Sequence, residues 1–322
     1  MASSMQSAAL RFASNEIIIG LQKEVAKLTQ FTTDFSAKAA NKGETMMIPI
    51  MLANAANNFN RTNNNYGTVN GSMMYTPMTF GINPKHSFGF TEADFSLVNG
   101  TQFWSKSGVA SSEAISLRIA EEVGKLISST YIKTSGTDGT EWFDADGEAL
   151  TVTQPTFSAN NVFNIGTGDL TKLTIAKLRV ACKNVGIPVS KTILALTSEK
   201  FAELLSLLDA NMYGGTEAIR MGMIPGLYGY KAVMEFDEIA EGVGALIPDN
   251  SIAIASRVKE IQNAHLYQEV GTTTDDKSGL VVQMRRGGDW TTGDAVATAE
   301  CLFGVKLIQP TKVVRLVAEA AS

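Results

Sequence analysis

The stretch over residues 45–80 reads TMMIPIMLANAANNFNRTNNNYGTVNGSMMYTPMTF. Two apolar, methionine-rich runs flank a centre with eight Asn residues between Asn54 and Asn70. Asn and Gly favour turns, so the centre predicts the tip of a long antiparallel hairpin. Pro49 and Pro77 have no N–H to donate to a ladder, which suits strands at a sheet edge.

The two predicted strands are apolar on both faces. Alternate residues of a strand share one face. In the first strand Met46, Ile48, Ile50 and Leu52 share one apolar face, and the other face, with Met47 and Pro49, is also mostly apolar. A ten-residue strand reaches ~33 Å, and a lone two-stranded ribbon is marginally stable in water. We therefore expect a projecting arm whose apolar surface is covered by another molecule. The residues expected at that surface are Met46, Ile48, Ile50, Leu52, Met74, Met78 and Phe80.

The composition is rich in apolar and poor in charged residues. The chain has 322 residues, of which 44% are hydrophobic and 18% are charged, against the roughly 25% charged residues of average domains. Low charge is typical of a subunit that hides surface in an assembly, and equally of an ordinary low-charge monomer. The net charge of −5 argues against a dedicated nucleic-acid binder, which would carry a basic patch.

Cys182 and Cys301 are too few for a disulfide framework or a zinc set, and their apolar neighbours predict free buried thiols. The first dozen residues, MASSMQSAALRF, lack the basic start and apolar core of a secretory signal. No run approaches the ~18 apolar residues of a membrane span. We expect a protein made in a reducing cytoplasm, with no membrane association.

Residues 14–30 predict an amphipathic helix. A polar stretch follows to Lys42, so the helix has little local partner sequence. We expect an arm that docks on another subunit, and the alternative of a helix covering its own domain stays open. The expected contact stripe is Ile17, Leu21, Val25 and Leu28.

Two further helices are predicted, over 111–130 and roughly 170–186. Ser111 or Ser112 is expected to cap the first. The acidic loop over 134–149 between them fits a solvated turn better than a calcium site. The inward residues expected of the first helix are Ile115, Ile119, Val123, Leu126 and Ile127, and those of the second are Leu173, Ile175, Leu178, Ala181 and Val185.

The second half of the chain predicts a mixed α/β segment. TILALTSEKFAELLSLL indicates a strand, a turn and a helix starting near Ser198, and GMIPGLYGYKAVMEF indicates a Gly-rich turn into a strand. The tail predicts two strands separated by a proline step. The expected fold class is α+β.

The sequence offers no common catalytic or metal-binding pattern. His86 and His265 stand outside any HExxH or HxxxH spacing, no GxSxG occurs, and residues 166–169 lack the third Gly of a dinucleotide fingerprint. Arg285 and Arg286 are expected as a solvated or interfacial pair rather than an anion site. We therefore predict no enzyme activity, no cofactor and no metal.

The order of these elements resembles the major capsid proteins of tailed double-stranded DNA phages, whose fold is named after phage Hong Kong 97. The likeness covers about residues 15–318. The segments that carry it are KGETMMIPI and INPKHSFGFTEADF in the extended hairpin, VGIPVSKTILALTSEKFAELLSLL, MGMIPGLYGYKAVMEF, and TAECLFGVKLIQPTKVVRL near the end.

The resemblance implies a division into an N-terminal arm, an extended E-loop, a peripheral (P) domain, an axial (A) domain with a central mixed sheet flanked by helices, and return strands. The corresponding ranges are 1–40, 41–92, 93–186 with the spine helix at 111–130, 187–285, and 286–322. It implies self-assembly into pentamers and hexamers of an icosahedral shell, in which the E-loop and the arm contact neighbouring subunits. The residues expected in loops around the symmetry axes are Tyr213, Gly214, Gly215, Asp275 and Asp276.

The resemblance also implies partners and a location. Since no scaffolding extension precedes the arm helix, either a separate scaffold protein acts or such an extension has been removed. A portal, possible decoration proteins and packaged DNA held without sequence-specific contacts complete the expected virion, which assembles in the host bacterial cytoplasm. No Lys–Asn crosslinking pair is identified. An encapsulin-like compartment shell and, in a different class, a bacterial surface or adhesive protein remain as alternatives.

Overall fold

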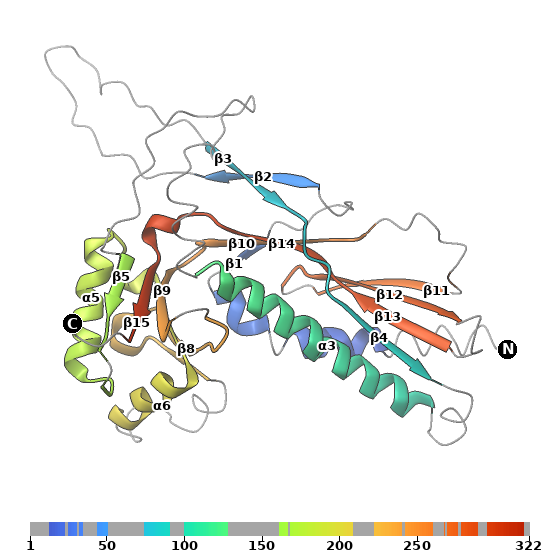
Figure 1. Ribbon diagram of the computed structural model, residues 1–322, viewed down its shortest axis with the longest axis horizontal. Coiled ribbons are helices and arrows are strands. Elements are labelled where there is room, and N and C mark those ends of the chain that lie inside the picture. The colour runs from blue at the N-terminus through green and yellow to red at the C-terminus, as the bar shows by residue number, and fades with distance from the viewer. Residues whose placement is uncertain are drawn as a thin grey trace, which may run out of the picture.

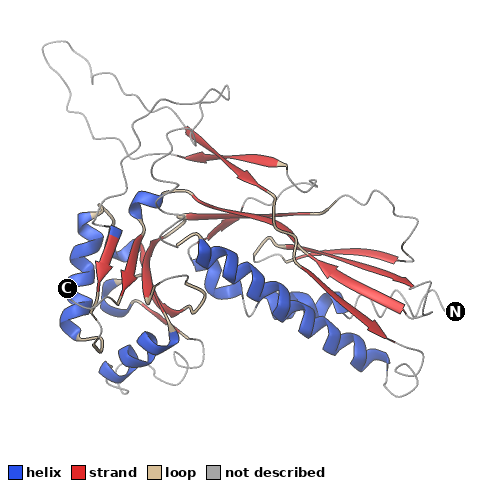
Figure 2. Ribbon diagram, viewed as in Figure 1, coloured by secondary structure: helices blue, strands red, loops and turns tan. Residues whose placement is uncertain are grey.

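The protein is described by a computed structural model. The described residues are 13–22, 25–30, 32–34, 44–50, 74–90, 100–127, 161–166, 168–208, 222–239, 242–259, 267, 269–275, 278–288 and 295–318. Helices and strands are mixed along the chain (Figure 2), as the α+β prediction requires.

The described strands form four sheets (Figure 1). The largest is mixed, because β6 pairs parallel to β8 but antiparallel to β9. Its strands, in spatial order, are β5 (Val162–Asn164), β15 (Val314–Val317), β9 (Gly244–Pro248), β6 (Thr192–Leu196), β8 (Ala232–Glu235) and β7 (Met223–Pro225).

The three smaller sheets lie to one side of the six-stranded sheet (Figure 1). The four-stranded sheet contains β11 (Glu269–Thr274), β12 (Val281–Gly288), β13 (Ala295–Glu300) and β4 (Lys85–Phe90). The three-stranded sheet contains β1 (Thr32–Asp34), β10 (Ile252–Arg257) and β14 (Leu302–Leu307). The last sheet is the ribbon of β2 (Thr45–Ile50) and β3 (Met74–Thr79).

The longest described helix, α3, runs along β4 of the four-stranded sheet (Figure 1). The ribbon β2–β3 lies on the opposite side of β10 and β14 from α3. The described helical segments are the helix over 13–22, η1 (Val25–Gln30), α3 (Gly100–Lys125), α5 (Lys172–Asn184), η4 (Val189–Lys191), α6 (Ser198–Leu207), η5 (Leu227–Gly229) and η7 (Pro310–Lys312).

Strand β6 shows how the cores are arranged, because all five of its residues are buried. Alternate side chains of a strand point to opposite faces. Ile193 and Ala195 join the core that includes α3, whereas Leu194 and Leu196 join the core beneath α5 and α6. The sheet is therefore covered on both faces, which explains its continuous apolar sequence.

Helix α3 begins eleven residues before the predicted start at 111. Its expected inward stripe is confirmed, since Ile115, Ile119, Val123, Leu126 and Ile127 are all buried. The expected caps were wrong, because Ser111 and Ser112 are buried inside the helix. The Ser112 hydroxyl donates back to the carbonyl of Val109, which satisfies it without ending the helix.

Helix α5 differs from its prediction in two ways. Ile175, Leu178 and Ala181 are buried as expected, but Leu173 is 65% exposed. At about 100° per residue, Leu173 lies roughly 160° around the helix from Ile175, so the two cannot share a face. In addition, α5 packs in the core of the six-stranded sheet, whereas the expected P-domain range 93–186 grouped it with α3.

Candidate assembly surfaces

One face of the ribbon β2–β3 is buried within the chain itself. Because the strands pair with Met46 opposite Met78 and Ile48 opposite Thr76, these four side chains share a face. Ile48, Met78 and Phe80 are buried. The residues that cover them are Ala253 and Ala255 on β10, Leu302 on β14, and Ile308.

This packing corrects the expected subunit interface. Ile48, Met78 and Phe80 belong to the core of their own chain, and Met46 is partly buried against it. Two contacts fix this face further: the Arg257 guanidinium lies 5.3 Å from the Phe80 ring centre, and one of its nitrogens donates to the sulfur of Met46 at 3.2 Å. The ribbon is anchored at its base. The side chains of Ile50 and Met74, and Leu52, lie outside the described residues.

The opposite face of the ribbon is open. Met47 is 45% exposed and Pro49 is exposed, while Tyr75 and Pro77 are half-buried. The two prolines leave gaps in the hydrogen-bonding ladder and keep the surface apolar. This outer face, Met47, Pro49, Tyr75 and Pro77, is the part of the ribbon that another molecule can cover.

The N-terminal helix packs on its own chain. The expected docking residues Ile17, Leu21, Val25 and Leu28 are all buried in the core shared with α3. Small residues allow the close approach: a Cβ on Gly20 would lie 2.0 Å from the Ser112 hydroxyl, and one on Gly108 would lie 2.7 Å from the Ala13 carbonyl oxygen. The alternative of a helix covering its own domain is therefore the correct one for the described residues.

Asp275 is not placed as expected. It directly follows β11, a strand of the four-stranded sheet that α3 accompanies and not of the six-stranded sheet. Its buried carboxylate accepts hydrogen bonds from the Ser278 hydroxyl, from the Ser278 N–H at 3.0 Å and from Gln22 at 2.8 Å. Asp275 thus holds a turn against the N-terminal helix. The other expected axial residues, Tyr213, Gly214, Gly215 and Asp276, lie outside the described residues.

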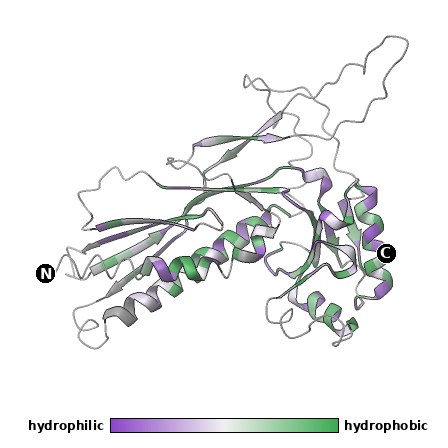
Figure 3. Ribbon diagram, turned by 180° about the vertical axis from the view of Figure 1, so that it is seen from behind, coloured by the Kyte–Doolittle hydropathy of each residue, from purple (hydrophilic) through white to green (hydrophobic). Residues whose placement is uncertain are grey.

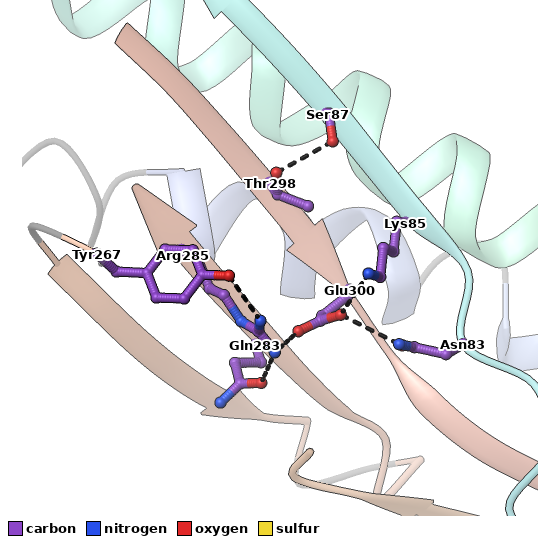
Figure 4. Close-up of polar contacts among 8 residues, drawn as sticks. All are labelled: Asn83, Lys85, Ser87, Tyr267, Gln283, Arg285, Thr298 and Glu300. Atoms are coloured by element: carbon purple, nitrogen blue, oxygen red, sulfur yellow. Dashed lines mark hydrogen bonds and ion pairs between the residues drawn. The ribbon is translucent and has the colours of Figure 1, made fainter. Parts of the chain in front are cut away.

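A polar network around the buried Glu300, not predicted from the sequence, joins β12 and β13 to β4 and to the connection that precedes β4 (Figure 4). Glu300 on β13 is 1% exposed and forms an ion pair with Arg285 on β12. Its other oxygen accepts from Asn83 at 3.1 Å and lies 3.8 Å from the Lys85 nitrogen. Arg285 also donates to Gln283 at 3.0 Å.

The two arginines are therefore not the solvated or interfacial pair that the sequence suggested. Arg285 lies 5.2 Å from the ring centre of Tyr267, and Arg286 lies 5.7 Å from that of Trp104 on α3. Both guanidinium groups pack within the protomer. A signal for this was available, since Glu300 is an acid in an otherwise uncharged strand sequence and requires a cationic partner when buried.

Solved structures with a similar arrangement of elements include a phage capsid. The capsid structure of the cyanophage P-SCSP1u matches with a TM-score of 0.51 and 10% identity, covering 90% of this chain and 87% of that one. A structure of Mycobacterium phage Adephagia matches with a TM-score of 0.50 and 10% identity, covering 92% and 90%. The chain has the Hong Kong 97-type capsid fold. A virus-like particle from Pyrococcus furiosus is also matched, with a TM-score of 0.46 and 12% identity, covering 94% and 98%.

No family model and no curated protein sequence matches the chain. The shared feature is therefore the fold. Among the described residues, no group of three or more His, Cys, Asp or Glu side chains could hold a metal ion. No helix within the described ranges has the length and apolarity needed to cross a membrane.

Both cysteines are buried and free, as predicted. Burial raises the pKa of Cys301 to about 11 from its ordinary value of 9.0, and it also raises the pKa of Cys182. Because the thiolate is the reactive form, we expect neither thiol to react with iodoacetamide near pH ~8 in the native protein. Both should react once the protein is unfolded in guanidinium chloride, and mass spectrometry distinguishes the two cases.

The same shift predicts a pH dependence of stability. Between pH 9 and about 11 the folded protein retains the Cys301 proton that the unfolded chain releases. The contribution to stability is therefore complete below pH 9 and is lost as the pH rises through this window. A Cys301→Ala variant should show a smaller loss of unfolding free energy over the same window in urea titrations. If the variant lost as much unfolding free energy as the wild type over this window, Cys301 would be excluded as the source of the pH dependence.

Proposed function

We propose that the chain is the major capsid protein of a tailed phage, assembling into pentamers and hexamers of an icosahedral shell around double-stranded DNA. The observation that carries this proposal is the capsid fold together with a ribbon that is anchored on one face and apolar but open on the other. Such a ribbon fits a contact that is completed by a neighbouring copy.

The mechanism is the burial of apolar surface repeated by symmetry. The anchored base sets the direction of the E-loop, and its outer face lies over the P domain of the next subunit. Apolar burial contributes about 25 cal/mol per Å², so a single contact of this size is modest. Closure of a ring joins each subunit through several such contacts at once, which makes the assembly stable. Ile50, Leu52 and Met74 remain proposed as E-loop contacts.

The experiment that tests the proposal is replacement of Met47 by Asp. We expect the fold to remain, because Met47 points away from the protomer core, and the yield of closed shells to fall at least about tenfold. Sedimentation and negative-stain microscopy measure the yield. The matched control is Val270→Asp on β11, whose side chain is 41% exposed.

Two results would contradict the proposal. One is a wild-type chain that stays monomeric, both alone and with a scaffold protein. The other is equal shell yield from Met47→Asp, Val270→Asp and wild type, which would leave the outer face of the ribbon without a role in assembly. Shells that contain an enzyme cargo instead of DNA would favour the compartment-shell alternative.

The remaining partners follow from the same proposal. A separate scaffold protein, a portal and decoration proteins would act with the shell, and assembly would take place in the host cytoplasm. The net charge of −5 supports a wall that confines DNA with little attraction. Tyr213, Gly214, Gly215 and Asp276 stay proposed as residues near the symmetry axes.

A further inference from the structure

The outward face of α5 is apolar and basic. Leu173 and Val180, which are 65% and 56% exposed, have the most exposed large apolar side chains in the described part of the chain. They are seven residues apart, about 10 Å along the helix and on the same side. Figure 3 shows hydrophobic and hydrophilic residues alternating along this helix, seen from behind.

The charged residues of α5 are all basic. Helix α5 contains no acidic residue, and its four bases are exposed. None of the four forms an ion pair with a described residue. They are Lys172, Lys177, Arg179 and Lys183.

A hollow of about 540 Å³ elsewhere on the chain carries the opposite charge, because it is lined by apolar and mainly acidic residues. It lies where α3, η1 and the turn after β8 meet, and Leu117 and Ala120 of α3 form part of its apolar lining. Leu117, at 54%, is the third most exposed large apolar side chain among those described. The charged lining consists of four acids and one base: Glu113, Glu235, Asp237, Glu238 and Lys27.

The acidic character of the hollow is not cancelled locally. Lys27 lies 3.8 Å from Glu235, so it offsets one of the four acids. Asp237 accepts a hydrogen bond from the N–H of Ser198 at 2.6 Å, which orients it without neutralising it. Glu113 forms no ion pair with a described residue. An incoming surface that is apolar in the centre and basic at its edge would complement this site.

We propose that α5 of one copy docks in this hollow on a second copy. The contact brings Val180 against Leu117 and the bases of α5 against the acids of the hollow. It is a contact between two different surfaces of the same chain, and repetition of such a contact closes a ring. The inference rests on the proposed function, and it names surfaces that join subunits in addition to the E-loop.

A cysteine pair tests the contact directly. The full-length double variant Leu117→Cys/Val180→Cys, oxidised under assembly conditions, should give a ladder of disulfide-linked dimers, trimers and larger chains on a non-reducing gel. Each single variant should stay monomeric, because the contact is not between identical residues. Cys182 and Cys301 contribute no background, since both are buried. The matched control is Val270→Cys/Val180→Cys.

Charge reversal tests the complementarity. Adding Lys177→Glu or Glu113→Lys to the double variant should each lower the crosslinked fraction about fivefold, as expected for an exposed charge pair. Combining the two reversals should restore most of it. Lys106→Glu on α3, which removes an exposed base outside the hollow, should leave the ladder unchanged.

The outcomes separate this inference from the proposed function. Shells seen by microscopy together with the ladder support both. Shells without a ladder, or a ladder of equal strength from the Val270→Cys control, overturn the docking of α5 and leave the capsid function standing. A chain that forms neither shells nor oligomers overturns the proposed function, and the inference falls with it.

Discussion

Replacing Ile48 with Asp is expected to lower the free energy of unfolding by at least about 4 kcal/mol. Ile48 is fully buried between the ribbon and the strands β10 and β14. Truncating a buried Ile to Ala costs about 2–5 kcal/mol, and Asp adds the cost of removing a carboxyl group from water. Urea denaturation followed by circular dichroism measures the change.

The neighbouring residue provides the control. Met47 lies on the other face of the same strand, so Met47→Asp should change the unfolding free energy by less than about 0.5 kcal/mol. Ile48→Val should cost only about 1 kcal/mol, because it removes one methylene. If Ile48→Asp were as stable as Met47→Asp, the inner face would be free in solution and the ribbon would project from the protomer on both sides.

The hairpin could be predicted from the sequence, but which of its faces is buried could not. Both faces of the two strands are apolar, so the alternation of side chains along each strand does not show which face is buried. The residues that decide between them are more than 170 positions away along the chain. Strand β10 reads IAIA, with Ile252 and Ile254 in the core beneath α3 and Ala253 and Ala255 beneath the ribbon. Small residues on one side of a strand indicate a closely packed second layer, and this signal was available.

A similar reason explains why the packing partner of the N-terminal helix could not be predicted. Its stripe was predicted correctly, but its partner was assigned to another subunit because the following residues are polar. The partner is α3, and the complementary features are Gly20 opposite Ser112 and Ala13 opposite Gly108. The local sequence shows which residues of a helix repeat on one face. It does not show which small residues allow two helices to approach closely, because this depends on which helices cross.

The prediction was more successful for segments whose packing partners lie close to them in the sequence. The strand and helix of TILALTSEKFAELLSLL appear as β6 and α6, with α6 starting at Ser198. This unit buries its strand under its own helix, since Phe201 and Leu204 share a core with Leu194 and Leu196. The polar network of Glu300 was missed for the opposite reason, because Glu300 and its partners come from three separate segments of the chain.

Replacing Glu300 with Gln is expected to lower the free energy of unfolding by about 3 kcal/mol. The substitution keeps the shape of the side chain but removes the charge that faces Arg285 and Lys85. Arg285 is then left buried without its anionic partner, and the desolvation cost of its guanidinium is no longer offset. Because Asn83 and Lys85 belong to the segment that follows the ribbon β2–β3, the loss also loosens that segment from β13.

An exposed ion pair of the same chemistry is the matched control for this prediction. Glu121 is paired with Arg118 on the surface of α3, and Glu121→Gln should change stability by no more than about 0.5 kcal/mol. In a double-mutant cycle, Arg285→Met and Glu300→Gln together should cost at least about 1 kcal/mol less than the sum of the two single changes. Strict additivity would mean that the two side chains do not interact in solution.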